Sequence, residues 1–109
     1  MTIAEFKTYQ AEARKTYFDP KEHKIIYATM GLVGEAGELA NKVKKIMRGD
    51  TNHDELLIGI KAEMGDILWY LSALADDLGV ELGDIAAGNI EKLQSRQMRD
   101  KLRGSGDQR

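Results

Sequence analysis

The chain has 109 residues, of which 42% are hydrophobic and 31% charged, and a formal net charge of −2. These values suit one soluble globular domain and argue against a general binder of nucleic acid or anionic membranes. Because there is no cysteine, no apolar run of about 18 residues and no apolar leader segment, we expect a cytoplasmic protein without disulfides, thiolate metal sites or membrane spans.

Two helices are predicted in the first half of the chain. The first opens with the capping-box pattern Thr2-x-x-Glu5 and runs to about residue 16, because Pro20 breaks the helical pattern that follows. The second covers about residues 22–47. Gly49 lies where a C-terminal cap is needed.

Two further helices are predicted in the second half. The third begins near Asp54, an N-cap candidate, and ends at Gly79. The fourth runs from about residue 82 to about residue 97. Residues 1–99 are therefore expected to form a single all-α domain, an antiparallel four-helix bundle-like fold, and the polar tail 100–109 is expected to be flexible.

Two acidic pairs, Glu35-x-x-Glu38 and Glu63-x-x-Asp66, occupy matching places on the second and third helices. At about 100° per residue, the acids of each pair lie about 60° and 120° to the same side of their helix's apolar stripe. The stripes consist of Leu32, Ala36, Leu39, Val43 and Ile46 on the second helix, and Ile60, Met64, Ile67, Leu71, Leu74 and Leu78 on the third.

The spacing around the intervening turn predicts that the acids converge. A short turn near Asp50 makes the two helices antiparallel neighbours, and packing through their stripes brings equal flanks to one side. Glu38 then lies level with Glu63, and Glu35 with Asp66. The alternative is a solvated acidic flank neutralised by nearby lysines, which does not explain the mirrored placement.

Four converging carboxylates without cysteine or paired histidine favour a hard cation. We expect Glu35, Glu38, Glu63 and Asp66 to bind Mg²⁺, with Mn²⁺ as an alternative and more than one ion per site. A di-iron site would need Glu-x-x-His on two helices, and that pattern is absent. Carboxylate-held Mg²⁺ completes its shell with substrate phosphates, so the sequence indicates phosphate-ester or phosphoanhydride chemistry.

Donors for substrate phosphates are available on two helices. Asn89, Lys92 and Arg96 share one face of the fourth helix, and Lys42 shares the acidic flank of the second. The alternative for Lys92 and Arg96 is ordinary surface charge, and for Lys42 an ion pair with Glu38 one turn away.

Trp69 lies opposite the apolar seam of the third helix. Two interpretations remain open for this side chain. It could pack in a core or subunit interface, or it could provide a stacking surface for a nucleobase.

The segments GLVGEAGELANKVKK (31–45) and EMGDILWYLSALA (63–75) closely resemble those of MazG-like nucleotide pyrophosphohydrolases, and NIEKLQSR (89–96) resembles that family's last helix. The resemblance spans about residues 25–97. It implies an all-α nucleoside triphosphate pyrophosphohydrolase fold. It also implies Mg²⁺-dependent hydrolysis between the α and β phosphates, giving a nucleoside monophosphate and pyrophosphate.

The resemblance also implies roles for single residues. Glu35, Glu38, Glu63 and Asp66 match the family's metal ligands, and one of these acids, with Glu38 and Glu63 as our candidates, would orient or deprotonate the attacking water. Asn89 and Lys92 match positions that handle phosphate or metal. Homo-oligomers are implied too, as dimers or tetramers whose subunits build the sites together.

Three functions follow from these observations. The leading hypothesis is an enzyme that hydrolyses unwanted nucleotides, a house-cleaning role in the nucleotide pool. The first alternative is a relative with a dedicated substrate such as dUTP, dCTP or phosphoribosyl-ATP. The second is a non-catalytic helical interaction module, which would be expected to have lost one or more of the four acids. All four are present here.

Overall fold

The computed structural model describes residues 5–49 and 52–99, and every regular element among them is helical. The predicted all-α class with four helices is confirmed. The elements are α1 (Phe6–Arg14), the 3-10 helix η1 (Lys21–His23), α2 (Ile26–Met47), α3 (His53–Leu78) and α4 (Leu82–Met98). None of these helices combines the length and the apolar character that a membrane crossing requires.

Local chemistry fixes the ends of the two long helices. Gly49 follows the end of α2 with φ 76°, and Gly79 closes α3 with φ 71°, a left-handed conformation that glycine adopts readily. Asn52, and not the predicted Asp54, caps the start of α3, because its side chain accepts a 2.9 Å hydrogen bond from the Glu55 N–H. The predicted turn centre, Asp50, lies outside the described residues.

The start of α2 differs from the sequence prediction. A separate 3-10 helix occupies the positions expected for its first turn, and α2 begins at Ile26. Lys21 and Ile25 have φ values of 54° and 71°, which a continuous α-helix cannot contain. Asp77, from the far end of α3, accepts a 2.7 Å hydrogen bond from the Ile25 N–H and so fixes where α2 starts.

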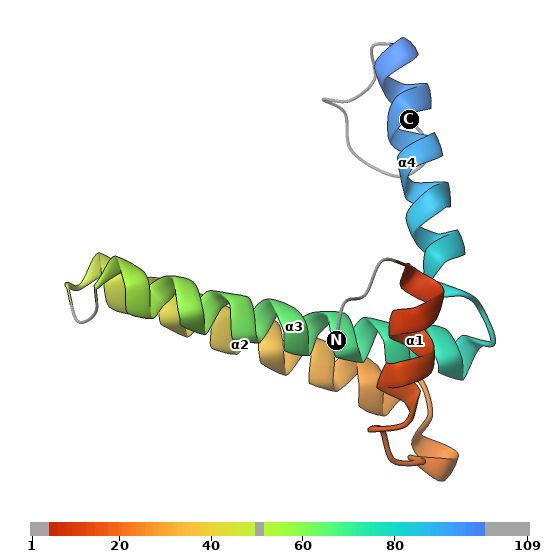
Figure 1. Ribbon diagram of the computed structural model, residues 1–109, viewed down its shortest axis with the longest axis horizontal. Coiled ribbons are helices and arrows are strands. Elements are labelled where there is room, and N and C mark those ends of the chain that lie inside the picture. The colour runs from red at the N-terminus through yellow and green to blue at the C-terminus, as the bar shows by residue number, and fades with distance from the viewer. Residues whose placement is uncertain (1–4, 50–51, 100–109) are drawn as a thin grey trace.

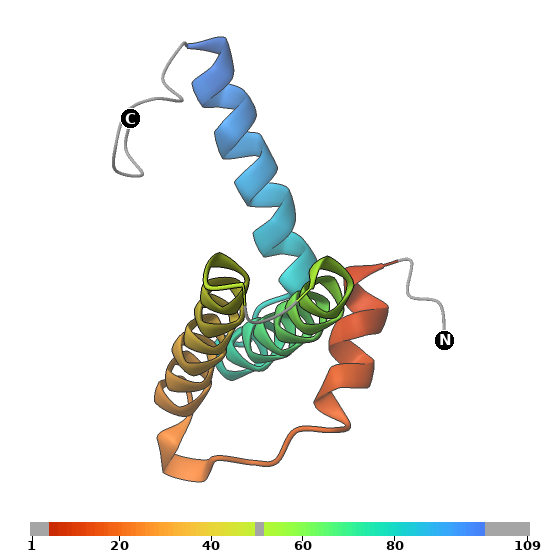
Figure 2. The ribbon, with the colours of Figure 1, turned by 90° about the vertical axis from the view of Figure 1, so that its left-hand side faces the viewer.

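The helices form a hairpin with two attachments at one end (Figure 1). α2 and α3 run antiparallel along their length, and α1 packs against α3. α4 contacts α1 and α3 at this end and then projects away from the hairpin in both views (Figures 1 and 2). The predicted bundle is therefore only partly formed within one chain, because α4 does not lie along the hairpin.

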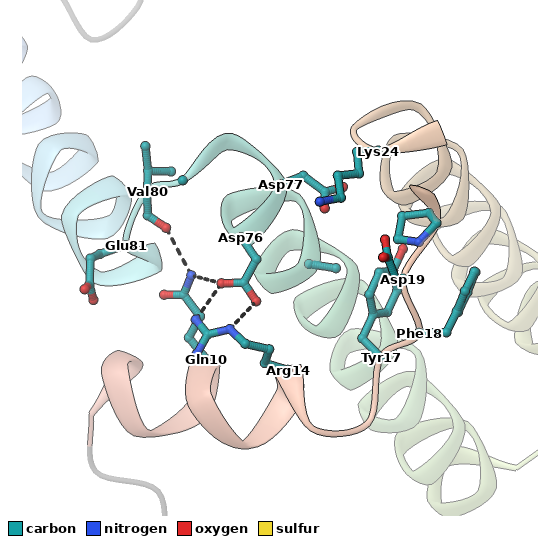
Figure 3. A pocket seen from close by; sticks show the side chains of 13 residues that line it. Gln10, Arg14, Tyr17, Phe18, Asp19, Lys24, Asp76, Asp77, Val80 and Glu81 are labelled. Carbon is teal, nitrogen blue, oxygen red and sulfur yellow. Dashed lines mark hydrogen bonds and ion pairs between the residues drawn. The ribbon is translucent and has the colours of Figure 1, made fainter. Parts of the chain in front are cut away.

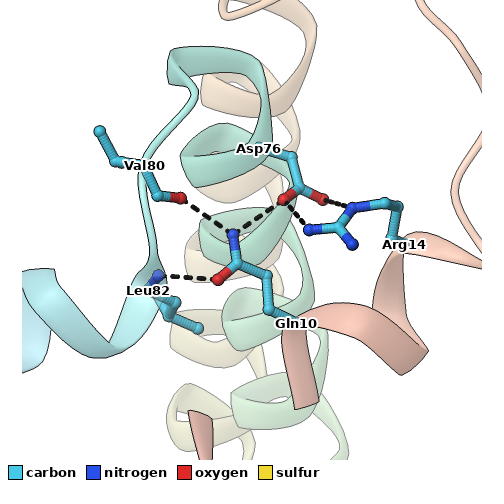
Figure 4. A network of polar contacts seen from close by, with 5 residues as sticks. All are labelled: Gln10, Arg14, Asp76, Val80 and Leu82. Atoms are coloured by element: carbon cyan, nitrogen blue, oxygen red, sulfur yellow. Dashed lines mark hydrogen bonds and ion pairs between the residues drawn. The ribbon is translucent and has the colours of Figure 1, made fainter. Parts of the chain in front are cut away.

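The buried core lies where α1, α3 and α4 meet. The buried apolar side chains there are Ala13, Ala73, Ala75 and Leu82, and Ala28 on α2 is also buried. The buried amide of Gln10 connects three segments there: Nε2 donates to Asp76 Oδ1 (2.8 Å) and to the Val80 carbonyl (3.0 Å), while Oε1 accepts from the Leu82 N–H (2.8 Å; Figure 4). Arg14 adds an ion pair to Asp76 at 2.7 Å. We call this group the Gln10 network.

The apolar stripes of the hairpin are incompletely covered. Leu32 and Ile67 are half-buried as expected, but Met64 is 58% exposed and Leu78 53% exposed. Further apolar side chains on the hairpin are also exposed, among them Ile26, Met30 and Val33. The prediction that the two stripes bury each other is therefore wrong for five stripe residues, which are exposed: Ala36, Val43, Met64, Leu71 and Leu78. Among the described helices, α1 and α4 pack only at one end of the hairpin, so much of its length has no third helix beside it.

Candidate metal centre

The register of the hairpin is fixed by two contacts between α2 and α3. A Cβ atom at Gly31 would overlap the Tyr70 ring, so glycine allows the helices to approach closely there. Further along, Lys42 Nζ lies 3.4 Å from the Gly59 carbonyl oxygen. One helical turn inward from each contact, Glu35 lies level with Asp66 and Glu38 with Glu63, which is the register predicted from the sequence.

Three of the four acids converge in this part of the hairpin. Carboxylate oxygens of Glu35, Glu63 and Asp66 lie within 4.8 Å of one another; we call these residues the acid cluster. Glu63 is only 7% exposed, and its Oε2 is buried without a hydrogen-bond donor among the described residues. A buried carboxylate oxygen without a donor is costly, so the arrangement suits a cation. Glu38, one turn away, is exposed and does not belong to the cluster.

The charges of the acid cluster are balanced unevenly. Lys42 Nζ lies 2.8 Å from Glu63 Oε1, and this hydrogen bond, followed by one shared with Glu35, lowers the pKa of Glu63. The pKa of Glu35 is raised, first by the hydrogen bond that it shares with Glu63, then by burial and by the charge of Asp66. Without a metal ion, Glu35 is therefore the carboxyl of this pair that binds a proton more readily, while Glu63 stays ionised to lower pH.

This geometry can be set beside known proteins. The family whose model matches the chain is the MazG nucleotide pyrophosphohydrolase domain, and the match covers residues 25–99. The chain belongs to this family. The resemblance recognised from the two acidic motifs is thereby confirmed. The matched range starts beside the first residue of α2, so α1 lies outside it.

A curated relative is also similar to the chain. The Gene 37 protein of Mycobacterium phage L5 is 51% identical over 91 residues, which are 78% of this chain and 76% of that protein. No solved structure matches the chain.

The predicted phosphate-binding residues of this MazG domain occupy two separate places. Lys42 contacts the acid cluster directly, and its partner is Glu63 across the hairpin. Asn89, Lys92 and Arg96 lie on α4, which leads away from the hairpin (Figures 1 and 2). Asn89 is exposed, Lys92 is half-buried and Arg96 is 3% exposed. A single chain therefore brings Lys42, but not the residues of α4, to the acids.

Trp69 belongs to an aromatic cluster beside the acids. Its Nε1–H donates a 2.7 Å hydrogen bond to Thr16 Oγ1. Its ring meets Tyr17 and Tyr70 edge-on, with centroids 5.0 Å and 5.1 Å away. In this structure the indole packs the α1–α2 segment against α3, while its half-buried ring is still partly accessible.

Two phenols near the acid cluster were not identified as site residues from the sequence. The pKa of Tyr9, on α1, is raised by burial and then by the charge of Asp66. The pKa of Tyr70 is raised by burial, by Tyr27 and then by Glu35 and Asp66. Tyr70 follows Asp66 by one helical turn, which could have indicated its position. Nothing in the local pattern around Tyr9 predicts that α1 packs there.

A cavity of about 540 Å³ opens between α1, the α1–α2 segment and the end of α3 (Figure 3). It was not foreseen from the sequence, because its walls come from distant segments. Tyr17 and Phe18 form part of the wall, and Arg14, Lys24, Asp19, Asp76, Asp77 and Glu81 supply its charged groups. On α3 its lining begins at Ala73, two helical turns or about 10 Å beyond Asp66. Tyr17 lines this cavity and also meets the Trp69 ring edge-on.

Proposed function

We propose that this MazG domain is a Mg²⁺-dependent nucleoside triphosphate pyrophosphohydrolase. It would hydrolyse ribo- or deoxyribonucleoside triphosphates between the α and β phosphates, giving a nucleoside monophosphate and pyrophosphate. The observation that carries the proposal is the convergence of Glu35, Glu63 and Asp66 at a buried carboxylate oxygen of Glu63 that has no donor in the described part of the chain. Family membership supports the reaction class.

The donor set fits Mg²⁺ or Mn²⁺, which prefer carboxylate oxygens. Glu35, Glu63 and Asp66 would hold the first ion, and Glu38, level with Glu63 and exposed, could complete the shell or hold a second one. When bound, such ions neutralise phosphate charge and make a coordinated water more acidic.

Side chains of the protein would orient the attacking water, accept its proton and bind the phosphates. Glu63, ionised and buried in the acid cluster, would orient the attacking water, and Glu38, the exposed acid beside the cluster, would accept its proton. Lys42 carries a positive charge next to the place where phosphate oxygens would lie. The proton leaves the water as its oxygen bonds to phosphorus, and pyrophosphate departs as the bond between the α and β phosphates breaks.

A second copy of the chain would supply the residues that α4 carries away from its own hairpin. Asn89 and Lys92 would bind the phosphates of a neighbouring chain's substrate in a dimer or tetramer, and Arg96, which is 3% exposed in the single chain, would join them once its side chain is uncovered. The exposed apolar surface of the hairpin supports this assembly, since a small domain that leaves Met30 67% exposed and Val33 62% exposed has surface for a partner.

The nucleobase would bind on the aromatic side of the acid cluster. Trp69 and Tyr17 provide accessible ring surface there, and the neighbouring cavity is large enough for a base and sugar. We propose a house-cleaning role in the cytoplasm, with neither nucleic acid nor membrane as a partner. The same acids would also serve an enzyme dedicated to dUTP, dCTP or phosphoribosyl-ATP, and the walls around Trp69 would then decide the substrate.

A substrate screen tests the proposal. The chain is incubated with Mg²⁺ and a panel of canonical and modified nucleoside triphosphates, and monophosphate, pyrophosphate and orthophosphate are quantified. Equal amounts of monophosphate and pyrophosphate are expected, and release of orthophosphate alone would contradict cleavage between the α and β phosphates. Glu38→Gln should abolish turnover without changing helicity by circular dichroism, so turnover like that of the unsubstituted chain would exclude Glu38 from the mechanism.

A further inference from the structure

We propose that Lys42 is a built-in counter-cation of the acid cluster, which holds Glu63 when no metal is bound and must be displaced when a metal ion enters. This inference rests on the metal site of the proposed function. It gives Lys42 a role before substrate arrives, in addition to phosphate binding. Lys42 is a positioning residue in this account, because it acts on the metal through Glu63.

Lys42 is held by two acceptors on the opposite helix of the hairpin. Its Nζ lies 2.8 Å from Glu63 Oε1 and 3.4 Å from the Gly59 carbonyl oxygen, so two acceptors on α3 hold one ammonium from α2. The side chains of Lys42 and Glu63 are 32% and 10% exposed, whereas those of the Lys15–Glu12 pair on α1 are 69% and 39% exposed. The enclosed pair is less screened by water, so its attraction is stronger.

A metal ion and this ammonium would compete for one carboxylate. Glu63 is the buried member of the acid cluster, and one of its oxygens is already taken by Lys42. Two cations sharing that carboxylate would lie a few ångströms apart and repel each other at close range. Binding of the ion is therefore expected to weaken or break the Lys42–Glu63 contact.

A cavity next to Lys42 can accommodate its side chain after displacement. Towards the α2–α3 turn, a cavity of about 150 Å³ is lined by Lys42, Lys45, Glu55, Leu56 and Gly59. A lysine side chain has four flexible carbons, so the ammonium can turn from Glu63 into this cavity without movement of the helix. The displaced charge would remain beside the site, where it could meet a phosphate oxygen.

The test compares the metal affinity of two lysine variants in the absence of nucleotide. Lys42→Met keeps a long apolar side chain and removes the charge, and Lys45→Met removes the same charge from the same helix and the same cavity wall. Mn²⁺ binding to the full chain is measured from the electron paramagnetic resonance signal of free Mn²⁺. We expect Lys42→Met to bind Mn²⁺ about 5- to 30-fold more tightly than the unsubstituted chain, and Lys45→Met to change the affinity less than about twofold.

Thermal unfolding distinguishes displacement of Lys42 by the metal ion from a change in side-chain packing caused by the substitution. Metal-free Lys42→Met should melt at a lower temperature than the unsubstituted chain, and saturating Mn²⁺ should raise its melting temperature by more. Lys42→Arg, which keeps a charge that can reach Glu63, should retain nearly the native affinity. If Lys42→Met does not fold without metal, Lys42→Gln replaces it and should also bind Mn²⁺ more tightly.

Equal or weaker Mn²⁺ binding by the uncharged variants would overturn this inference and leave the proposed function intact. Absence of Mn²⁺ binding by the unsubstituted chain would overturn both. Pyrophosphate release, measured separately, shows whether the enzyme assignment survives in either case.

Discussion

Helix α3 contributes Asp76 to the Gln10 network and Glu63 to the acid cluster, and the two carboxylates differ in how many hydrogen-bond donors surround them. Around Asp76, every carboxylate oxygen has a donor: Oδ1 accepts from Gln10 Nε2 and Arg14 Nη2, and Oδ2 accepts from Arg14 Nε. Around Glu63, oxygens of two other carboxyls lie within 4.8 Å and Lys42 contacts one oxygen, while the other has no donor within residues 5–49 and 52–99. The Gln10 network is complete by itself and stabilises the fold, whereas the acid cluster is completed only by a proton or a cation. The environment of an acid, and not the number of acids, therefore distinguishes a structural group from a binding site.

The largest expected effect is on catalysis and comes from the acid cluster. Glu35→Gln should reduce pyrophosphate release by about 100-fold or more, because it removes a metal ligand. The melting temperature of the metal-free protein should not fall, because glutamine resembles the protonated form that the raised pKa of Glu35 favours. Turnover and thermal unfolding are measured on the same preparation.

Glu22→Gln provides the matched control for this change. Glu22 lies on η1 with a side chain that is 77% exposed, and its substitution should leave turnover within about twofold. If Glu35→Gln retained full turnover, the acid cluster would not be the catalytic centre.

The Gln10 network should show the reverse pattern. Gln10→Ala is expected to lower the free energy of unfolding by about 2–3 kcal/mol, because it leaves the Leu82 N–H and the Val80 carbonyl without their partner. Urea denaturation measures the change, and exposed Lys7→Ala on the same helix should stay within about 0.5 kcal/mol. Metal affinity of the folded Gln10→Ala protein should be unchanged, and a large loss would show that the two regions are coupled.

The affinity of the acid cluster for metal should depend on pH. The raised pKa of Glu35 means that a proton competes with the ion for this carboxylate. Mn²⁺ affinity is therefore expected to fall as the pH drops below that pKa, by at most about tenfold per pH unit for one displaced proton. Calorimetry in buffers with different ionisation enthalpies measures the released proton, and an affinity that does not change as the pH is lowered through the titration of the Glu35 carboxyl would contradict it.

The stability of the metal-free protein should depend on pH through Glu63 and Glu35, and the two carboxyls should contribute in opposite directions. The lowered pKa of Glu63 contributes stability at neutral pH that is lost as the pH falls through its folded-state pKa. The raised pKa of Glu35 contributes stability in acid that is lost as the pH rises through its folded-state pKa. The pair is therefore most stabilising between the two values, at mildly acidic pH, and Glu35→Gln should remove the loss on the alkaline side.

The smallest expected effect concerns a glycine on the exposed surface of α2. A Cβ at Gly34 meets no atom within 4 Å, so Gly34→Ala should stabilise α2 by about 0.5–1 kcal/mol in urea unfolding at low protein concentration. Gly31→Ala has the opposite sign, because its Cβ would overlap the Tyr70 ring. Destabilisation by Gly34→Ala at high protein concentration would indicate that a second chain covers this face.

The sequence predicted the parts of the structure that depend on local pattern. Apolar periodicity gave the four helices, and Gly49 and Gly79 lie at the predicted ends of α2 and α3 because a left-handed residue is a local requirement. The sequence also predicted that Glu35 lies level with Asp66, because residues at equal distances from a turn are opposite each other in an antiparallel helix pair.

The parts that depend on distant segments were not predicted. The start of α2 is set by Asp77, which is far away in sequence, and the partner of Lys42 is Glu63 on the neighbouring helix and not Glu38 on its own. The direction of α4 is set by packing at the end of the hairpin, which no periodic pattern encodes. Helical phase therefore predicted which acids share a flank, but not which of them becomes buried.

The Gln10 network also fixes the angle at which α4 leaves the hairpin. α4 has 17 residues, so it extends about 25 Å from the corner at which Gln10 holds Val80 and Leu82. A change of about ten degrees at that corner would shift the far end of the helix, where Arg96 lies, by about 4 Å. A single buried amide on α1, outside the range shared with the MazG family, thus sets the direction of the helix whose side chains are proposed to reach the site of a neighbouring chain.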